Sequence, residues 1–186
     1  MRSRKDKILL NLAGTVRNIG FTPNMVTALG LLFGVGCGFS FAYRITPIGF
    51  LLGSLSVVCD LLDGAIARTF NLETAFGLVF DSVSDRVSEW AVVVGAIWSG
   101  IIYPIGAVAI VGSLLLLMMR ALSYLQGLNT DYVVFGRVER LIFIFFGLVA
   151  PFAEASTVCF VISGGFGFMS SCQIASSLLG QRKKMI

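Results

Sequence analysis

The stretch CDLLDGAIARTFNLETAFGLVFDSVSDR, from Cys59 to Arg86, places four carboxylates within strongly apolar sequence. The first two are three residues apart and the last two are four apart, so each pair shares one face of a helix. A short loop near residues 70–75 would join the two helices. The sequence therefore predicts two facing pairs of carboxylates, and the residues are Asp60, Asp63, Asp81 and Asp85.

The rest of the chain has the composition of a membrane protein. Its 186 residues are 56% hydrophobic and 13% charged, whereas soluble domains carry about 25% charged residues. A hydrocarbon core of about 30 Å needs roughly 20 apolar residues per helix. We therefore expect one all-α integral membrane domain over residues 1–186, with a six-helix bundle at about 25–179. The expected spans are 25–43, 47–67, 77–99, 103–125, 138–153 and 156–179.

Residues 1–22 form a basic N-terminus followed by a juxtamembrane segment. Ile8, Leu9, Leu12, Val16 and Ile19 recur at helical spacing, which predicts an amphipathic helix on the membrane surface. A signal peptide is the competing interpretation, because basic residues precede an apolar stretch. Asn11 and Arg17 interrupt that stretch and favour the surface helix.

The basic residues predict the orientation of the chain. Six spans put both termini on one side, and Lys and Arg concentrate on the cytoplasmic side of membrane proteins. With the N-terminus inside, Arg44 is the one basic residue of the sequence on the outside. We expect the other 13 of the 14 at cytoplasmic helix ends: Arg2, Arg4, Lys5, Lys7, Arg17, Arg68, Arg86, Arg120, Arg137, Arg140, Arg182, Lys183 and Lys184. The aspartates then meet near the cytoplasmic surface, and the distribution argues against nucleic acid as a partner.

Small residues recur every fourth position in the first span, at Gly30, Gly34, Gly38 and Ala42. This spacing lets helix backbones approach closely. It indicates either packing within the chain or a dimer contact. The four cysteines have no CxxC spacing and lie in apolar stretches, so we interpret them as small packing residues.

Four clustered carboxylates need a cation to hold them together. The chain has no histidine, and all-oxygen ligation suits Mg²⁺, Mn²⁺ or Ca²⁺. Mg²⁺ commonly completes its coordination with water and substrate phosphate, so the cluster indicates a phosphate-bearing substrate. Gly64 and Gly77 leave space beside the carboxylates, and Arg68 could contact a diphosphate. A proton or cation pathway, as in an ion-coupled transporter, is the alternative.

The spacing Asp60-x2-Asp63-Gly64-x2-Ala67-Arg68-x8-Gly77-x3-Asp81-x3-Asp85 resembles the signature of the CDP-alcohol phosphotransferases. The segment TPNMVTALG, from Thr22 to Gly30, also resembles the start of the first span in that family. The resemblance implies phospholipid biosynthesis in a prokaryotic cytoplasmic membrane. A hydroxyl attacks the β-phosphorus of a CDP-linked lipid and CMP leaves. It also implies a metal cofactor, Mg²⁺ or Mn²⁺ with two ions, and a homodimer.

The resemblance assigns a role to each signature residue. The metal ligands would be Asp60, Asp63, Asp81 and Asp85. Asp85 would act chiefly as the general base on the acceptor hydroxyl. The CDP site would contain Asp60, Gly64, Ala67, Arg68 and Gly77.

Three arginines provide a hypothesis for the acceptor. Arg120, Arg137 and Arg140 would suit a phosphate on the acceptor alcohol. The stretch GRVER, residues 136–140, resembles the phosphatidylinositol phosphate and archaetidylinositol phosphate synthases, whose acceptor is inositol phosphate. Leu122 stands where those synthases usually have a second basic residue. Phosphatidylglycerol phosphate synthase and phosphatidylserine synthase remain alternatives, with diacylglycerol or archaeol as the lipid.

Overall fold

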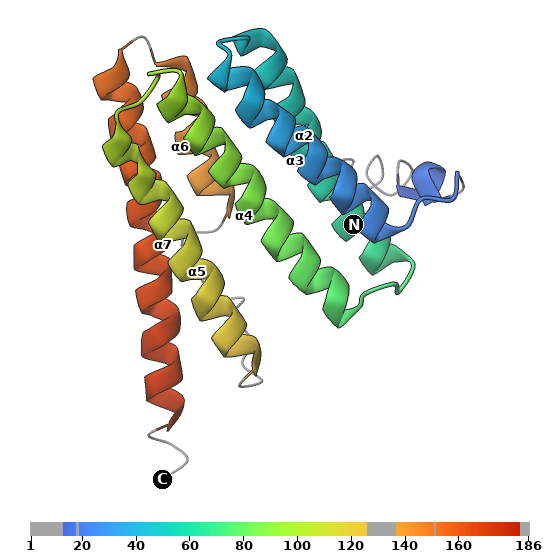
Figure 1. Ribbon diagram of the computed structural model, residues 1–186. Helices are drawn as coiled ribbons and strands as arrows, with labels where there is room; N and C mark the ends of the chain where they lie inside the picture. The colour runs from blue at the N-terminus through green and yellow to red at the C-terminus, as the bar shows by residue number, and fades with distance from the viewer. Residues whose placement is uncertain (1–12, 18, 126–136, 151, 183–186) are drawn as a thin grey trace, which may run out of the picture. The chain divides into compact units, whose positions relative to one another are not determined.

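The computed structural model describes residues 13–17, 19–125, 137–150 and 152–182, and these residues form helices and turns without a β-strand. The chain divides into two compact units, Met1–Val92 and Val93–Ile186. The first contains α2 (Pro23–Ala42), α3 (Thr46–Thr69) and most of α4 (Ala75–Trp98). The second contains η1 (Pro104–Ala107), α5 (Val108–Leu125), α6 (Arg137–Val149) and α7 (Ala153–Arg182) (Figure 1).

The prediction of an all-helical membrane protein is confirmed. Within the described residues, four helical segments are long and apolar enough to cross a membrane: Pro23–Ala42, Thr46–Thr69, Pro104–Ser123 and Ala153–Ser177. The remaining two predicted spans are also helical, as α4 and α6. They do not qualify by length and composition, because α4 carries charged residues and α6 has only 13 residues.

Local sequence signals fix the ends of the helices of the first unit. Thr22 caps α2 by accepting a hydrogen bond from the backbone N–H of Met25, and Pro23 follows at the first turn. Thr74 likewise accepts a hydrogen bond from the N–H of Gly77 at the start of α4, with N and O 2.9 Å apart. Between α3 and α4, Asn71 adopts a positive φ of 51°, a conformation that asparagine tolerates better than most residues.

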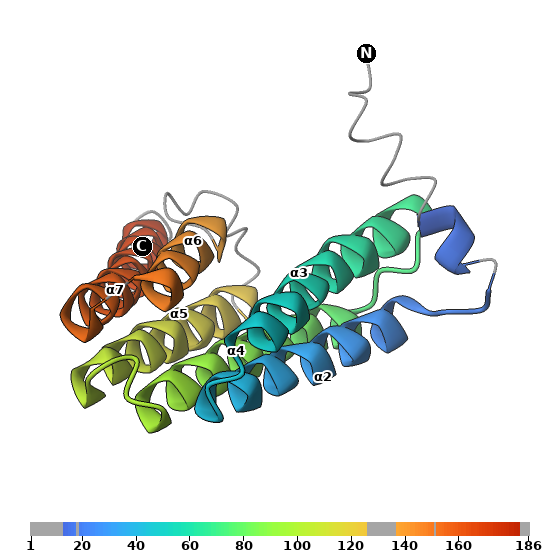
Figure 2. The ribbon, with the colours of Figure 1, turned by 90° about the horizontal axis from the view of Figure 1, so that it is seen from above.

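The glycines of α2 bring three helices of the first unit together. A Cβ at Gly30 would lie 3.1 Å from the Cβ of Cys59 on α3, and a Cβ at Gly38 would overlap the backbone carbonyl oxygen of Ala91 on α4. Ser56 of α3 donates a hydrogen bond of 2.8 Å to the carbonyl oxygen of Gly30. The small-residue ladder therefore serves packing within the chain. Figures 1 and 2 show α2 and α3 side by side along their length.

The apolar core of the first unit lies close to the predicted site. It contains Ala13, Val26, Ala65 and Ile66, each less than 6% exposed. Ala13 belongs to a helical turn over residues 13–17, so this part of the N-terminal segment packs on the unit. Ile19 lies in a turn and is exposed. The earlier part of the predicted surface helix and the basic residues Arg2, Arg4, Lys5 and Lys7 lie outside the described residues.

In the second unit, α5 and α7 run in the same direction. Tyr103, just before η1, donates from its backbone N–H to Thr157 Oγ1 at 2.9 Å and from its hydroxyl to Glu154 Oε1 at 3.0 Å. The Glu154 carboxylate thereby raises the pKa of the Tyr103 hydroxyl above its ordinary value. Further along both helices, a Cβ at Gly112 would overlap the carbonyl oxygen of Gly164. The segment before α5 is thus hydrogen-bonded to the beginning of α7, and the middles of α5 and α7 are in close backbone contact.

The glycine packing of α2 makes a testable prediction. Gly38→Ala should destabilise the protein by about 1–3 kcal/mol, because the new methyl group overlaps backbone that cannot move alone. Gly36→Ala on the same helix is the matched control. A Cβ there meets only the flexible end of the Leu52 side chain, at 3.2 Å, so this variant should be neutral or gain stability through helix propensity. Equal unfolding free energies for the two variants in detergent would contradict this packing.

Candidate metal and CDP site

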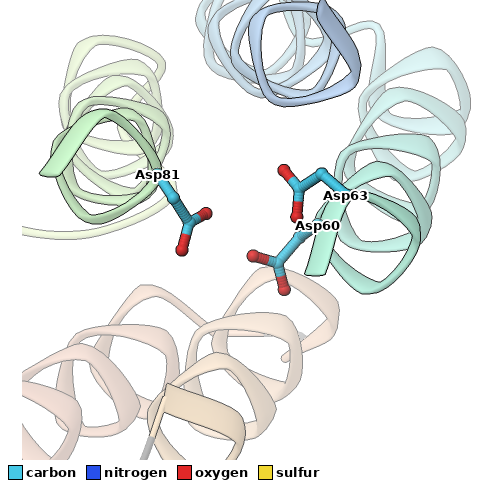
Figure 3. Close-up of side chains that lie close together, drawn as sticks. All are labelled: Asp60, Asp63 and Asp81. Atoms are coloured by element: carbon cyan, nitrogen blue, oxygen red, sulfur yellow. The ribbon is translucent and has the colours of Figure 1, made fainter. Parts of the chain in front are cut away.

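Three carboxylates from two helices converge in the first unit. Asp60 and Asp63 project from α3 and Asp81 projects from α4, and the three side chains point toward one another (Figure 3). One oxygen from each residue lies within 4.8 Å of the others. Asp63 is buried and the other two are half-buried. The spacing of three and four residues in the sequence therefore produces the predicted meeting of two helix faces.

A cavity adjoins these carboxylates and has a volume of about 120 Å³. It is formed entirely within the first unit, between the first turns of α2, the end of α3 and the beginning of α4. Six residues of the sequence signature line it: Asp63, Gly64, Ala67, Arg68, Gly77 and Asp81. The turn between α3 and α4 thus brings these six signature positions to one surface.

The two signature glycines have specific neighbours. A Cβ at Gly64 would lie 3.3 Å from Nη1 of Arg68, so the missing side chain makes room for the guanidinium one turn later. A Cβ at Gly77 would lie 3.1 Å from Oδ1 of Asn24 and 3.0 Å from Oγ1 of Thr74. The sequence suggested space for a ligand or a helix. The structure shows that both glycines first accommodate polar side chains of the cavity wall.

Arg68 lies both at the end of a helix and in the wall of the cavity. It lies in the last turn of α3, where a positive charge complements the partial negative charge of the helix end. Its guanidinium also lines the cavity beside Asp63 and Asp81. A planar guanidinium with several donors is well suited to phosphate oxygens.

Sequence reasoning missed several residues of this cavity. Asn24 and Thr27 of α2 line it, as do Glu73 and Thr74 of the turn before α4. Thr27 donates a hydrogen bond from Oγ1 to Oδ2 of Asp63 at 2.5 Å. The segment TPNMVTALG resembles the family as a whole and does not single out Thr27. No spacing rule links a residue of α2 to an aspartate 36 positions later.

The remaining predicted site residues are Asp85 and three arginines. Asp85 lies one turn beyond Asp81 on α4 and is half-buried, and it does not belong to the group of three converging carboxylates. Arg120 is half-buried on α5, and Arg140 is 1% exposed on α6. Arg137 begins α6, but its side chain lies outside the described residues. All three arginines belong to the second unit.

One basic residue expected at a cytoplasmic helix end is buried. Arg86 of α4 is 2% exposed and Glu89 is 7% exposed, and Arg86 Nη1 donates to Glu89 Oε2 at 2.9 Å. Arg86 also lies in the middle of α4 (Ala75–Trp98), so the expectation that it lies at a helix end is wrong. It instead neutralises an acidic residue one turn away on α4, which lets this helix carry both charges in an apolar setting.

Comparison with known proteins explains why these residues converge. The sequence model of the CDP-alcohol phosphatidyltransferase family matches residues 21–169, which include the whole signature and both helices of the site. The chain belongs to this family. It is therefore a membrane enzyme of phospholipid biosynthesis that transfers a substituted phosphate group from a CDP-linked lipid to an alcohol.

Two similar family members are named as synthases of inositol phosphate lipids. A phosphatidylinositol phosphate synthase of Mycobacteroides abscessus is 33% identical over 174 residues, covering 87% of this chain and 71% of the relative. An archaetidylinositol phosphate synthase of Pyrococcus horikoshii is 26% identical over 147 residues, covering 78% of each. The predicted resemblance to these two kinds of synthase is confirmed.

Solved structures of a phosphatidylinositol phosphate synthase have a fold similar to that of this chain. The phosphatidylinositol phosphate synthase of Mycobacterium tuberculosis with CDP-DAG bound has a TM-score of 0.77 and 27% identity, over 91% of this chain and 92% of that chain. The same synthase in complex with manganese and citrate also has a TM-score of 0.77, with 25% identity over 92% of this chain and 88% of that chain.

The buried pair on α4 makes a second prediction for this family member. Arg86→Met or Glu89→Leu alone should destabilise the protein by about 3–5 kcal/mol, because each leaves the opposite charge buried. The double variant should recover most of that loss. Unfolding free energies in detergent would measure the cycle, with Arg44→Asn at an exposed turn position as the control. Additive losses in the double variant would contradict a coupled pair.

Proposed function

We propose that this enzyme transfers the phosphatidyl-type group of a CDP-linked lipid to inositol phosphate and releases CMP. The observation that carries the proposal is the convergence of Asp60, Asp63 and Asp81 within 4.8 Å beside a cavity that Arg68 lines. The names of the similar synthases support inositol phosphate as the acceptor. Phosphatidylglycerol phosphate and phosphatidylserine synthesis are the alternative family activities, and the lipid is diacylglycerol- or archaeol-based.

The donor atoms at the site fit a divalent metal. They are carboxylate oxygens from three residues, the ligands that Mg²⁺ and Mn²⁺ prefer. We propose that Asp60, Asp63 and Asp81 hold the metal, with Asp85 completing a site for two ions. The ions would neutralise charge on the phosphate oxygens during transfer. A manganese complex of the related mycobacterial synthase supports a divalent cofactor.

Other residues of the chain would bind the CDP-lipid and accept the proton of the acceptor alcohol. Arg68 would bind the diphosphate of the donor with its guanidinium, which Gly64 leaves free to fold over the helix. Asp60, Ala67 and Gly77 would complete the CDP site. Asp85 would accept the proton of the acceptor hydroxyl as its oxygen attacks the β-phosphorus. The bond from that phosphorus to the CMP oxygen breaks, so CMP departs with the bonding electrons.

Arg120, Arg137 and Arg140 would bind the phosphate of the acceptor. Their chemistry supports this role, because guanidinium groups form paired hydrogen bonds with phosphate. The near-complete burial of Arg140 also argues against a simple role as a charge at the membrane surface. Each lies on a helix of the second unit.

We further propose that all six helices cross the membrane. Gly34 and Gly38 of α2 approach Ser88 and Ala91 of α4 in register, so α4 runs parallel to a spanning helix over the same depth. Because α5 and α7 also run parallel, the chain must return between them, and α6 is the helix that lies in that connection. Its 13 residues span about 20 Å, so flanking residues would complete the crossing.

The orientation and assembly are part of the same proposal. Basic residues at one set of helix ends support a cytoplasmic active site and cytoplasmic termini, in the cytoplasmic membrane of a prokaryote. The amphipathic N-terminal helix would lie on that surface, and the chain would act as one domain. We also propose that the protein is a homodimer, as the family resemblance implies. Mass measurement in nanodiscs would test it, and monomers alone would contradict it.

An acceptor assay tests the proposed function. Purified protein in nanodiscs with Mn²⁺ or Mg²⁺ should release CMP from CDP-diacylglycerol or CDP-archaeol most efficiently when inositol phosphate is supplied. Glycerol phosphate, serine and unphosphorylated inositol are the comparison acceptors. A preference for one of these would overturn the acceptor, whereas no CMP release with any of them would also overturn the catalytic assignment and favour the transporter.

The acceptor arginines can be tested in the same assay. Arg137→Ala or Arg140→Ala should raise the KM for inositol phosphate by about 10–100-fold, since a charged hydrogen bond contributes roughly 1.5–3 kcal/mol. The KM for the CDP-lipid should change little. Arg44→Asn, at the turn between α2 and α3, is the control. An equal rise in both KM values would contradict an acceptor-specific role.

The aspartates should separate into two classes. Asp60→Asn, Asp63→Asn and Asp81→Asn should each abolish CMP release together with metal binding, because each removes a converging ligand. Asp85→Asn should lose turnover while still binding the CDP-lipid, because the lost carboxylate is the proton acceptor. Isothermal titration with a CDP-lipid analogue would measure binding. Activity near wild type in any one variant would exclude that residue from its role.

A further inference from the structure

The hydroxyl of Thr27 is committed to one carboxylate of the site. Its Oγ1 lies 2.5 Å from Oδ2 of Asp63 and 3.1 Å from the carbonyl oxygen of Pro23. A hydroxyl has a single proton and donates one full hydrogen bond. Hydrogen bonds to an ionised acceptor are shorter and stronger than those to a neutral one, so the proton is directed to Asp63.

This hydrogen bond is buried and held by rigid surroundings. Thr27 is 7% exposed and Asp63 is 5% exposed. One helical turn after Thr27, Gly30 fits against Cys59, and Ser56 donates to the carbonyl oxygen of Gly30 at 2.8 Å. The distance between α2 and α3 is thus fixed by backbone packing. Thr27 and Asp63 are therefore carried by two helices whose separation is set one turn away.

The bond restricts the orientation of the metal-binding side chain. With Oδ2 held by Thr27, the Asp63 carboxylate cannot rotate freely, and its remaining lone pairs have a fixed direction. The cluster requires one oxygen from each of Asp60, Asp63 and Asp81 to lie within 4.8 Å of the others. The hydrogen bond from Thr27 connects one member of this cluster, Asp63, directly to α2.

We propose that Thr27 is a positioning residue for the metal site, acting by fixing the Asp63 carboxylate toward Asp60 and Asp81. This inference rests on the proposed metal site. Groups that hydrogen-bond to a metal ligand typically contribute 10–100-fold in metal affinity. Thr27 therefore extends the functional site from α3 and α4 to α2, through a residue outside the aspartate signature.

Metal binding by the purified full-length protein tests the proposal without activity. Mn²⁺ alone is titrated into protein in nanodiscs, and free Mn²⁺ is followed by electron paramagnetic resonance. Thr27→Val keeps the shape and removes the hydroxyl, so the Kd for Mn²⁺ should rise about 10–100-fold. Thr27→Ser restores the hydroxyl and should return the Kd to near the wild-type value. Thr27→Ala provides a second variant without the donor.

Ser56→Ala is the matched control. It removes another hydrogen bond between α3 and α2, of 2.8 Å, without touching a carboxylate. Its Kd for Mn²⁺ should be unchanged, although its thermal stability falls in a similar way to that of Thr27→Val. An equal loss of Mn²⁺ affinity in Ser56→Ala would show that general loosening of the helix pair, rather than positioning of Asp63, explains the effect.

Two further outcomes separate this inference from the proposed function. If wild-type protein binds no Mn²⁺, the metal site and the inference both fail. If wild type binds Mn²⁺ and Thr27→Val binds it equally well, only the inference fails. A raised KM for the CDP-lipid at saturating Mn²⁺, with an unchanged Kd for the metal, would also overturn it, because Thr27 would then act on the substrate that enters its cavity.

Discussion

Repulsion among three carboxylates is the constraint on which the rest of the structure depends. Oxygens of Asp60, Asp63 and Asp81 lie within 4.8 Å of one another. At an effective dielectric constant of about 20, each pair of full charges at that distance repels by roughly 3 kcal/mol. Such an arrangement is maintained only where a cation offsets the repulsion or helix packing holds the groups in place. Close helix packing surrounds the three carboxylates here, and their oxygens are a set of donors that suits a divalent metal.

The packing depends on residues that have little or no side chain. Gly30, Gly34 and Gly38 allow the backbone of α2 to touch α3 and α4. In a membrane this contact cannot rely on the hydrophobic effect, because lipid tails are as apolar as the side chains that they replace. Close backbone approach and buried hydrogen bonds such as Ser56 to Gly30 therefore contribute much of the specificity. The buried Arg86–Glu89 pair permits α4 to join this assembly despite its charges.

The sequence predicts most of this architecture because its signals are local. Apolar runs of about 20 residues give the helices, and spacings of three and four residues give the shared faces of the aspartates. The neighbours that fill the space beside Gly64 and Gly77 depend on rotamers and tertiary contacts, so the sequence predicts space but not its occupant. The bond from Thr27 to Asp63 joins positions 36 residues apart and has no periodic signal. For Arg86 a signal existed, since Glu89 follows at three residues in an apolar stretch, but the overall charge distribution led to the wrong interpretation.

The central claim is that three carboxylates from α3 and α4 form the metal site of a CDP-lipid transferase. Anomalous diffraction from crystals grown with Mn²⁺ and CDP tests it most directly. The account predicts a manganese peak about 2.0–2.6 Å from one oxygen of each of Asp60, Asp63 and Asp81, with the CDP phosphates beside Arg68. A manganese peak elsewhere, or none between these side chains at saturating Mn²⁺, would contradict it.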